Sequence, residues 1–432
     1  MSDVRTSRSR AARPPGPLVF VALTAALFLA SCAGRSDGVL TPVGDFAEPP
    51  GASRVDMLVA TMRRPTPGEP SRMFGGDRAR EMRFADIAVS IPPDSARVIG
   101  DVQWPANPPG DPSRDFVTVR AEELDAKGAQ AHLDQRLAHT PGRRVLLFVH
   151  GYNTRFDDAV YRFAQIAHDS RAAALPLLFT WPSRGRLLAY TYDRESATYS
   201  RDALEAVLQT LVKDKAVAEI DVLAHSMGNW AAIEALHQMA VRDGRIAPKI
   251  KEIVLAAPDV DFDVFLAQVS GMGSKRPPIT MFVSRDDKAL ALSARLWGDK
   301  RRAGAIDPNA EPYKSELAAL NVKTIDLSDV KSDDPLNHSK FAQSPEIVRL
   351  IGQRLANGQT LTESRSGIGE RIGVAAVGAA STVGGAAGVV VSAPLAIVDP
   401  QTRETLGERA SDIGDGIGDT LRSTADVVHI GR

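Results

Sequence analysis

The chain has 432 residues, of which 44% are hydrophobic, 52 are Lys or Arg and 53 are Asp or Glu. This composition allows a sizeable hydrophobic core, and the net charge of −1 argues against a nucleic-acid-binding protein. The single cysteine excludes an intramolecular disulfide, so the core alone must stabilise the fold.

The first 31 residues have the features of a bacterial signal peptide. Residues 1–17 carry four arginines, and residues 18–30 form an apolar run too short to span a bilayer stably. The run ends at Ala30-Ser31-Cys32, which matches a lipobox. We therefore predict cleavage after Ser31 and acylation of Cys32; an ordinary secretory signal or an uncleaved anchor is the alternative. Ala33, rather than Asp, favours the outer membrane, so we expect a lipid-anchored envelope protein facing the periplasm.

The mature chain divides into a tether, one domain and a tail. Residues 32–50 contain Pro and Gly and are predicted to form a tether from the membrane. Residues 51–357 are predicted to form a single α/β domain, because the strand-like stretches 55–61, 84–91 and 116–120 supply the first strands of one sheet.

Two continuous apolar runs follow, as is typical of buried parallel strands. The first, residues 145–149, ends in His150-Gly151-Tyr152-Asn153. The second, residues 176–180, ends in Trp181-Pro182-Ser183, and Tyr190, Tyr192 and Tyr199 come soon after it. These aromatic residues either line an apolar wall of a binding site or pack between the loop and the next helix.

The run Ile220-Asp221-Val222-Leu223-Ala224 leads into His225-Ser226-Met227-Gly228 and then into a helix-forming segment. This is the pattern small-x-Ser-x-small between a strand and a helix. Such a serine lies on a sharp turn that exposes its hydroxyl as a nucleophile. Ala224 stands where this motif usually has glycine. We predict that Ser226 is the nucleophile.

Acidic residues follow the next two predicted strands. Residues 252–257 precede Asp259, Asp261 and Asp263, and residues 279–283 precede Asp286 and Asp287. Three aspartates without a nearby histidine or a Gly-rich calcium loop are more typical of turn and capping residues than of a metal site. We therefore predict no metal and no cofactor.

A serine nucleophile needs a base, and only three histidines follow Ser226. His237 lies on the helix that leaves the serine, and His429 lies in the polar tail. His338 lies between the predicted strand 322–327 and a helix that Ser344-Pro345 announces, because serine favours the cap position and proline the first turn. His338 is therefore the predicted base.

The composition changes after residue 357. Residues 358–432 comprise a Gly/Ala-rich apolar segment and a charged, glycine-containing tail, and residues 372–398 carry no charge. This run is long enough to cross a bilayer, and its small residues are typical of helices that pack closely in lipid. Pro394 interrupts it, so we leave open whether it enters the membrane or packs elsewhere.

Taken together, the motifs at 148–153, 181–183, 224–228, 257–259 and 284–290 resemble one branch of the α/β-hydrolase superfamily, the family called domain of unknown function 900. Its members are described as esterase/lipase-like hydrolases. The resemblance covers residues 143–357. It implies a mostly parallel central sheet with helices on both faces; residues 261–278 leave little room for a large lid.

The resemblance also implies roles for individual residues. The backbone N–H groups of Tyr152 and Met227 would form the oxyanion hole, and the triad acid would follow the strand 279–283. Counting from Ser284 gives Asp287, with Asp286 or an aspartate of 259–263 as the alternatives. The expected function is a serine hydrolase acting on a small-molecule or lipid ester; the alternative is a catalytically idle envelope lipoprotein that uses the scaffold for interaction.

Overall fold

The computed structural model describes residues 37–44, 46–69, 71–298 and 300–356. The predicted signal peptide, Cys32 and the segment 372–398 lie outside these residues. Over the described part of the chain, no helix combines the length and apolarity needed to span a bilayer.

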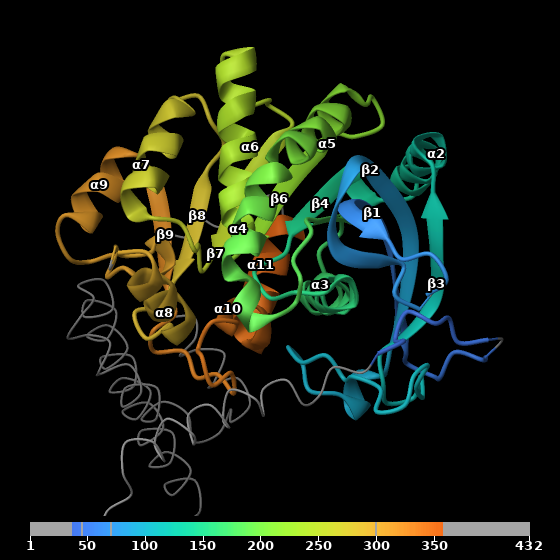
Figure 1. The fold of residues 1–432 in the computed structure, drawn as a ribbon. Coiled ribbons are helices and arrows are strands. Elements are labelled where there is room, and N and C mark those ends of the chain that lie inside the picture. Colours follow the sequence, from blue (N-terminus) through green and yellow to red (C-terminus); the bar gives the residue numbers. More distant parts are fainter. Residues whose placement is uncertain (1–36, 45, 70, 299, 357–432) are drawn as a thin grey trace, which may run out of the picture.

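A nine-stranded sheet forms the centre of the molecule, in the order β3-β2-β1-β5-β4-β6-β7-β8-β9 (Figure 1). β2 pairs antiparallel with β1 and β3, and all the other neighbouring pairs are parallel. The strands are β1 (Ser53–Pro65), β2 (Phe74–Ile91), β3 (Val117–Leu124), β4 (Arg144–Val149), β5 (Leu175–Thr180), β6 (Glu219–His225), β7 (Ile250–Ala256), β8 (Ile279–Val283) and β9 (Val322–Asp326).

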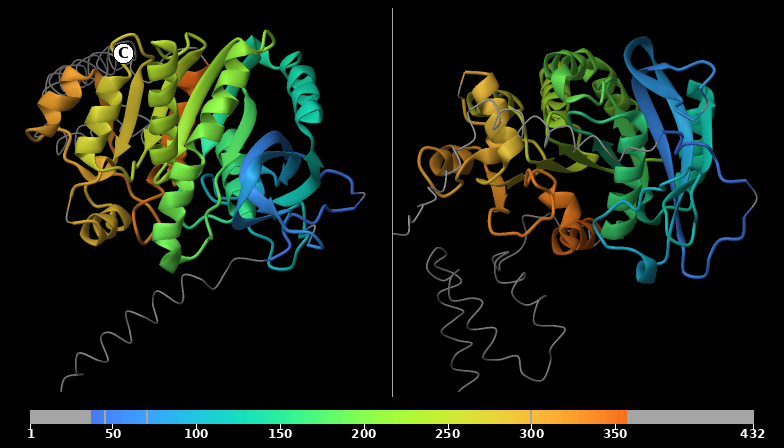
Figure 2. Two further views of the ribbon diagram at one scale, coloured as in Figure 1. Left: turned by 45° about the horizontal axis from the view of Figure 1, so that its top comes forward. Right: turned by 60° about the horizontal axis from the view of Figure 1, so that its bottom comes forward.

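Helices cover both faces of this sheet, and each face has its own hydrophobic core (Figures 1 and 2). Successive strand residues point to opposite faces, so Leu147 and Val149 join one core whereas Leu146 and Phe148 join the other. The first face is covered by helices that include α2 (Ala126–Leu137), α5 (Arg201–Lys213), α6 (Gly228–Asp243), α7 (Phe262–Gly271) and α9 (Tyr313–Ala319). The second is covered by α3 (Phe156–Ser170), α10 (Lys340–Gln343) and α11 (Pro345–Ala356). This architecture confirms the predicted α/β fold, and its parallel strands read as continuous apolar runs because both faces are buried.

The first strands are longer than the sequence pattern indicates. β1 and β2 pair from Ser53↔Ile91 as far as Pro65↔Phe74, with irregular register beyond Thr61. The outer half of β2 is rich in charged and small residues, so it carries no apolar signal.

Part of the expected tether packs against the domain. Val39 and Leu40 are fully buried, and the Val39 carbonyl accepts hydrogen bonds from Thr118 Oγ1 (2.8 Å) and Tyr161 Oη (2.9 Å). The packed structure therefore begins before residue 51.

The direction in which the chain adds strands to the sheet reverses at β4. From β4 the chain moves to β5 on one side, and it later returns to β6 on the other side of β4. Ligands of open α/β sheets bind beyond the carboxyl ends of the strands where the order reverses in this way. His150 follows β4 and Ser226 follows β6, so both lie at this point.

Candidate active site

Ser226 lies on a strained turn between β6 and α6. Its φ is +51°, a left-handed conformation that non-glycine residues seldom adopt. The turn is held by its neighbours, since the Ser226 N–H donates to the Ala256 carbonyl (2.9 Å) and the Ser226 carbonyl accepts Asn229 Nδ2 (2.9 Å). At Gly228 a Cβ would lie 2.3 Å from the His150 carbonyl oxygen, so only glycine fits there. This geometry is that of the sharp strand-to-helix turn predicted for Ser226.

The loop after β4 lies directly against this turn. A Cβ on Gly151 would lie 2.9 Å from both Ser226 Cβ and His225 Nδ1, which requires glycine at this position. The backbone of residues 151 and 152 is therefore beside the serine. Within the described part of the chain, the N–H groups of Tyr152 and Met227 donate no backbone hydrogen bond. Both of the predicted oxyanion-hole donors thus remain available.

A buried arginine that the sequence analysis missed holds the β4 loop from behind. Arg63 of β1 donates to the carbonyls of Thr154 (2.8 Å) and Ser183 (2.8 Å) and lies 3.3 Å from His150 Nε2. Burial lowers the pKa of Arg63 to about 10, which leaves it charged at neutral pH.

Asp193 completes this support under the same loop. Its carboxylate accepts Ser183 Oγ (2.5 Å) and the Arg184 N–H (2.9 Å), and Ser183 Oγ in turn accepts the Thr154 N–H (3.0 Å). Arg63 and Asp193 thus fix the loop that carries Tyr152. Neither residue belongs to a sequence motif, and only the break of the apolar pattern of β1 at Arg63 marks it.

His150 itself has a structural role. Its Nε2 accepts the Trp181 N–H (3.2 Å), its Nδ1 lies 2.8 Å from the Gly151 carbonyl, and its ring stacks on Trp181. Burial, reinforced by the charge of Arg63, lowers the pKa of His150 to about 3, so its ring is neutral. Trp181 is fully buried and packs between the loop and the core, as one of the two interpretations of the aromatic residues predicts.

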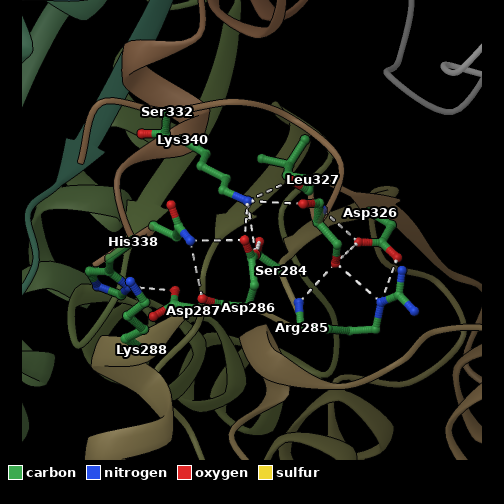
Figure 3. A network of polar contacts seen from close by, with 12 residues as sticks. Ser284, Arg285, Asp286, Asp287, Lys288, Asp326, Leu327, Ser332, His338 and Lys340 are labelled. Atoms are coloured by element: carbon green, nitrogen blue, oxygen red, sulfur yellow. Dashed lines mark hydrogen bonds and ion pairs between the residues drawn. The ribbon is translucent and has the colours of Figure 1, made fainter. Parts of the chain in front are cut away.

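The structure brings His338 and Asp287 together. His338 Nδ1 lies 2.7 Å from Asp287 Oδ2, and the side chain of Asp287 is fully buried (Figure 3). Asp287 Oδ1 also accepts the Leu290 N–H (2.9 Å), because Asp287 caps the start of α8 (Lys288–Leu296). With Nδ1–H donating to Asp287, Nε2 of His338 is left as a proton acceptor.

The loop that carries His338 is tied to the end of β8 by a second set of contacts. Lys340 Nζ donates to both oxygens of Asp286 (2.8 and 2.9 Å) and to the Leu327 carbonyl (3.0 Å), and Asn337 Nδ2 donates to Asp286 Oδ2 (2.9 Å) (Figure 3). Asp286 therefore holds Asn337 and Lys340, one on each side of His338 in the loop, whereas Asp287 holds the imidazole. Of the two adjacent acids, the one reached by counting from Ser284 is the partner of His338.

The His338 ring also adjoins the residue before the serine. Its centroid lies 4.9 Å from that of His225. Burial, reinforced by the charge of His338, lowers the pKa of His225 well below its usual value, so His225 is neutral. Burial alone would also lower the pKa of His338, but the charge and hydrogen bond of Asp287 outweigh burial, and the net pKa of His338 is raised.

The other predicted alternatives have separate partners. Asp259 accepts Tyr190 Oη (2.7 Å) and Ser293 Oγ (2.6 Å), Asp261 caps α7, and the exposed Asp263 lies 3.6 Å from Lys300. In the residues that the structure describes, no cluster of three potential metal ligands occurs. His237 lies within α6, more than two helical turns beyond Ser226, and its ring lies against Gly271 at the end of α7.

The chain is similar to a curated protein over part of its length. The chain is 27% identical over 122 residues to an uncharacterised protein of Nostoc sp. (alr1448), a match that covers 22% of this chain and 32% of that relative. The chain thus spans about a third of the length of this curated relative.

Solved structures that the chain matches include a lipase-esterase related protein of Clostridium acetobutylicum and a fungal esterase of Rhizomucor miehei. The first is 10% identical to this chain with a TM-score of 0.28, and the match covers 50% of this chain and 93% of the solved chain. The second is 12% identical to this chain with a TM-score of 0.28, and the match covers 81% of this chain and 93% of the solved chain. Similarity at this level carries no argument about activity.

A family model gives the decisive match. The model for alpha/beta hydrolases of unknown function, DUF900, matches residues 125–354, which is more than half of the chain and includes the turn at Ser226, Asp287 and His338. The chain therefore belongs to the DUF900 family of α/β hydrolases.

Proposed function

We propose that this protein is a serine hydrolase that cleaves carboxylic esters through Ser226, His338 and Asp287. The observation that supports this most strongly is the 2.7 Å contact between His338 Nδ1 and buried Asp287, formed beside the strained turn that carries Ser226. An orienting carboxylate, an imidazole and a serine on a sharp strand-to-helix turn are the components of nucleophilic acyl transfer.

The proposed reaction has two halves. Ser226 Oγ attacks the ester carbonyl while His338 Nε2 takes the hydroxyl proton, and the N–H groups of Met227 and Tyr152 bind the oxyanion. The intermediate collapses to an acyl-enzyme, and the alcohol leaves with the proton from His338. Water then attacks the acyl group, His338 takes its proton, and the acid is released as the proton returns to Ser226.

Replacing Ser226 by alanine tests this function. We expect Ser226→Ala to lower kcat for short-chain p-nitrophenyl esters by at least about 10³-fold, because the remaining groups only bind and polarise the ester. Ser270→Ala, on the exposed end of α7, is the matched control and should retain the parental rate. Equal rates for both variants would show that Ser226 is not the nucleophile, whereas no hydrolysis by the parent would favour the idle-scaffold alternative.

The pH dependence tests the proposed base. His338 must be neutral to accept a proton, so kcat/KM should rise with pH through its ionisation in the free enzyme. Asp287 raises the pKa of His338, so the midpoint should lie above about 6.5, the ordinary value for histidine. A pH–rate profile between pH 5 and pH 9 measures this midpoint, and a rate independent of pH over that range would exclude a histidine base.

We further propose that the enzyme is anchored in the cell envelope by a lipid on Cys32, most simply in the outer membrane facing the periplasm. The lipobox-like sequence before Cys32 supports this location. Metabolic labelling with a clickable palmitate analogue should label the parent chain and fail for Cys32→Ser. Label retained by Cys32→Ser would contradict the lipoprotein proposal.

A further inference from the structure

Exposed apolar side chains gather at the edge of the sheet that holds the candidate site. Of the eight large hydrophobic residues that are exposed in the described part of the chain, five lie on three segments at this edge. They are Leu187 (40% exposed), Leu188 (102%), Leu292 (49%), Leu296 (61%) and Leu336 (41%). Single exposed leucines are ordinary, but a group of them around a site marks an interaction surface.

Each of the three segments is fixed to a residue of the candidate site. Tyr152 Oη donates to the carbonyl of Leu187, which begins the short helix η3 (Leu187–Ala189). α8, with Leu292 and Leu296, begins directly after Asp287, and its first N–H, from Lys288, donates to the Leu336 carbonyl (2.9 Å). Figures 1 and 2 show α8, α10 and the beginning of α4 (Tyr190–Tyr199) at the same end of the sheet. We call the five leucines and their segments the leucine rim.

The leucine rim carries three exposed cations, Arg186, Lys288 and Arg295. Acidic residues adjoin the same segments: Asp193 and Asp287 are buried, Asp286 pairs with Lys340, Asp334 accepts backbone N–H groups, and Asp333 is exposed. Within the described residues, none of these three cations forms an ion pair. Exposed leucines combined with unneutralised cations complement an anionic lipid surface, where acyl chains lie beneath charged headgroups.

An aromatic wall continues from the rim toward Ser226. Tyr152 packs edge-on against Tyr190 with ring centroids 5.1 Å apart, and Tyr190 lies 5.9 Å from Trp297 at the end of α8. Tyr190 Oη is held by Asp259 and Ser293, so this ring has a fixed position. These rings place aromatic surface between α8 and the loop that carries Tyr152.

We propose that the leucine rim docks on an anionic phospholipid surface and that the enzyme takes acyl esters from that surface. The choice of substrate rests on the function proposed above, whereas docking itself needs no turnover. Arg186, Lys288 and Arg295 would attract the headgroups, and the exposed leucines would enter the boundary between headgroups and acyl chains.

Co-sedimentation with vesicles tests the docking. The full chain with Cys32→Ser, which removes the proposed lipid anchor, is mixed with vesicles of equal parts phosphatidylcholine and phosphatidylglycerol, or of phosphatidylcholine alone. We expect stronger binding to the mixed vesicles and weakening by added salt. In the same chain, Leu188→Asp/Leu296→Asp should raise the apparent Kd at least about tenfold, because two apolar insertions are lost and two negative charges are added.

A second double variant controls for the added negative charge and for vesicle binding by other parts of the chain. Val98→Asp/Val241→Asp makes the same chemical change at residues that are 62% and 69% exposed, and Val241 lies near the end of α6 opposite Ser226. This pair should bind within about threefold of the parent, since it adds only long-range repulsion. Equal effects of the two pairs, or no binding by the parent, would overturn the proposal. A concentration-dependent dimer without lipid, abolished by the rim pair alone, would also overturn it in favour of a second copy as the occupant.

Catalysis and docking can fail separately. Vesicle binding is measured with Ser226→Ala as well, and it should equal that of the parent. If docking fails while soluble esters are hydrolysed, only the lipid-surface inference is lost. If Ser226→Ala docks but the parent hydrolyses no ester, the proposed function is wrong and the rim remains a lipid-binding surface.

Discussion

Replacing His338 by alanine is expected to lower kcat for p-nitrophenyl esters by at least about 10³-fold, while substrate binding changes little. Without the imidazole of His338, the hydroxyl proton of Ser226 has no acceptor. The adjacent His225 does not replace it, because burial lowers the pKa of His225 and its ring is packed against Phe341. Steady-state kinetics on purified variants measures both kcat and KM.

His237→Ala is the matched control for this substitution. It also removes an imidazole after Ser226 in the sequence, but His237 lies more than two helical turns along α6 from Ser226 and packs against Gly271. It should retain kcat within a few fold. Similar losses from the two variants would mean that the proton acceptor has been misidentified.

Replacing Asp287 by asparagine is expected to lower kcat by about 10³- to 10⁴-fold. The amide keeps the shape of the side chain but withdraws the charge that stabilises protonated His338, and its NH₂ group favours the wrong tautomer of the ring. The pKa of His338, which Asp287 raises, should also fall, so the midpoint of the pH–rate profile should move to lower pH.

Two other carboxylates serve as controls for Asp287. Asp259→Asn changes a buried acid that accepts hydrogen bonds from Tyr190 and Ser293. Asp259 acts on His338 only through its charge, so this variant should lower the pKa of His338 slightly. Its kcat should stay within about tenfold of the parent. Asp286→Asn loosens the contacts with Lys340 and Asn337, so it should act mainly on thermal stability. If Asp259→Asn proved the more damaging variant, the acid would follow β7 rather than β8.

The sequence allows the prediction of those parts of the site that depend on local patterns. Buried parallel strands appear as continuous apolar runs, so the ends of β4, β6 and β8, and with them Gly151, Ser226 and Asp287, can be located directly. His338 can be found by elimination because few histidines follow Ser226. Counting from Ser284, as the family resemblance suggests, gave Asp287, which is the residue that contacts His338.

The parts that escaped prediction depend on contacts between distant segments. Arg63 precedes Thr154 by 91 residues and Ser183 by 120, and no local pattern shows that a buried guanidinium will support the β4 loop. The packing of Val39 and Leu40 was likewise hidden, because two apolar residues among Pro and Gly look like part of a linker. The exposed leucines of the rim cannot be told from core residues by sequence alone.

Covalent labelling of Ser226 tests the central claim most directly. The full chain is treated with a fluorophosphonate, and the modified peptide is identified by mass spectrometry. We expect one adduct, on Ser226, absent from Ser226→Ala and formed at least about 10²-fold more slowly in His338→Ala, because the unassisted hydroxyl is a weak nucleophile. An adduct on another residue, or ester hydrolysis without any adduct, would contradict the proposal that Ser226 is the nucleophile.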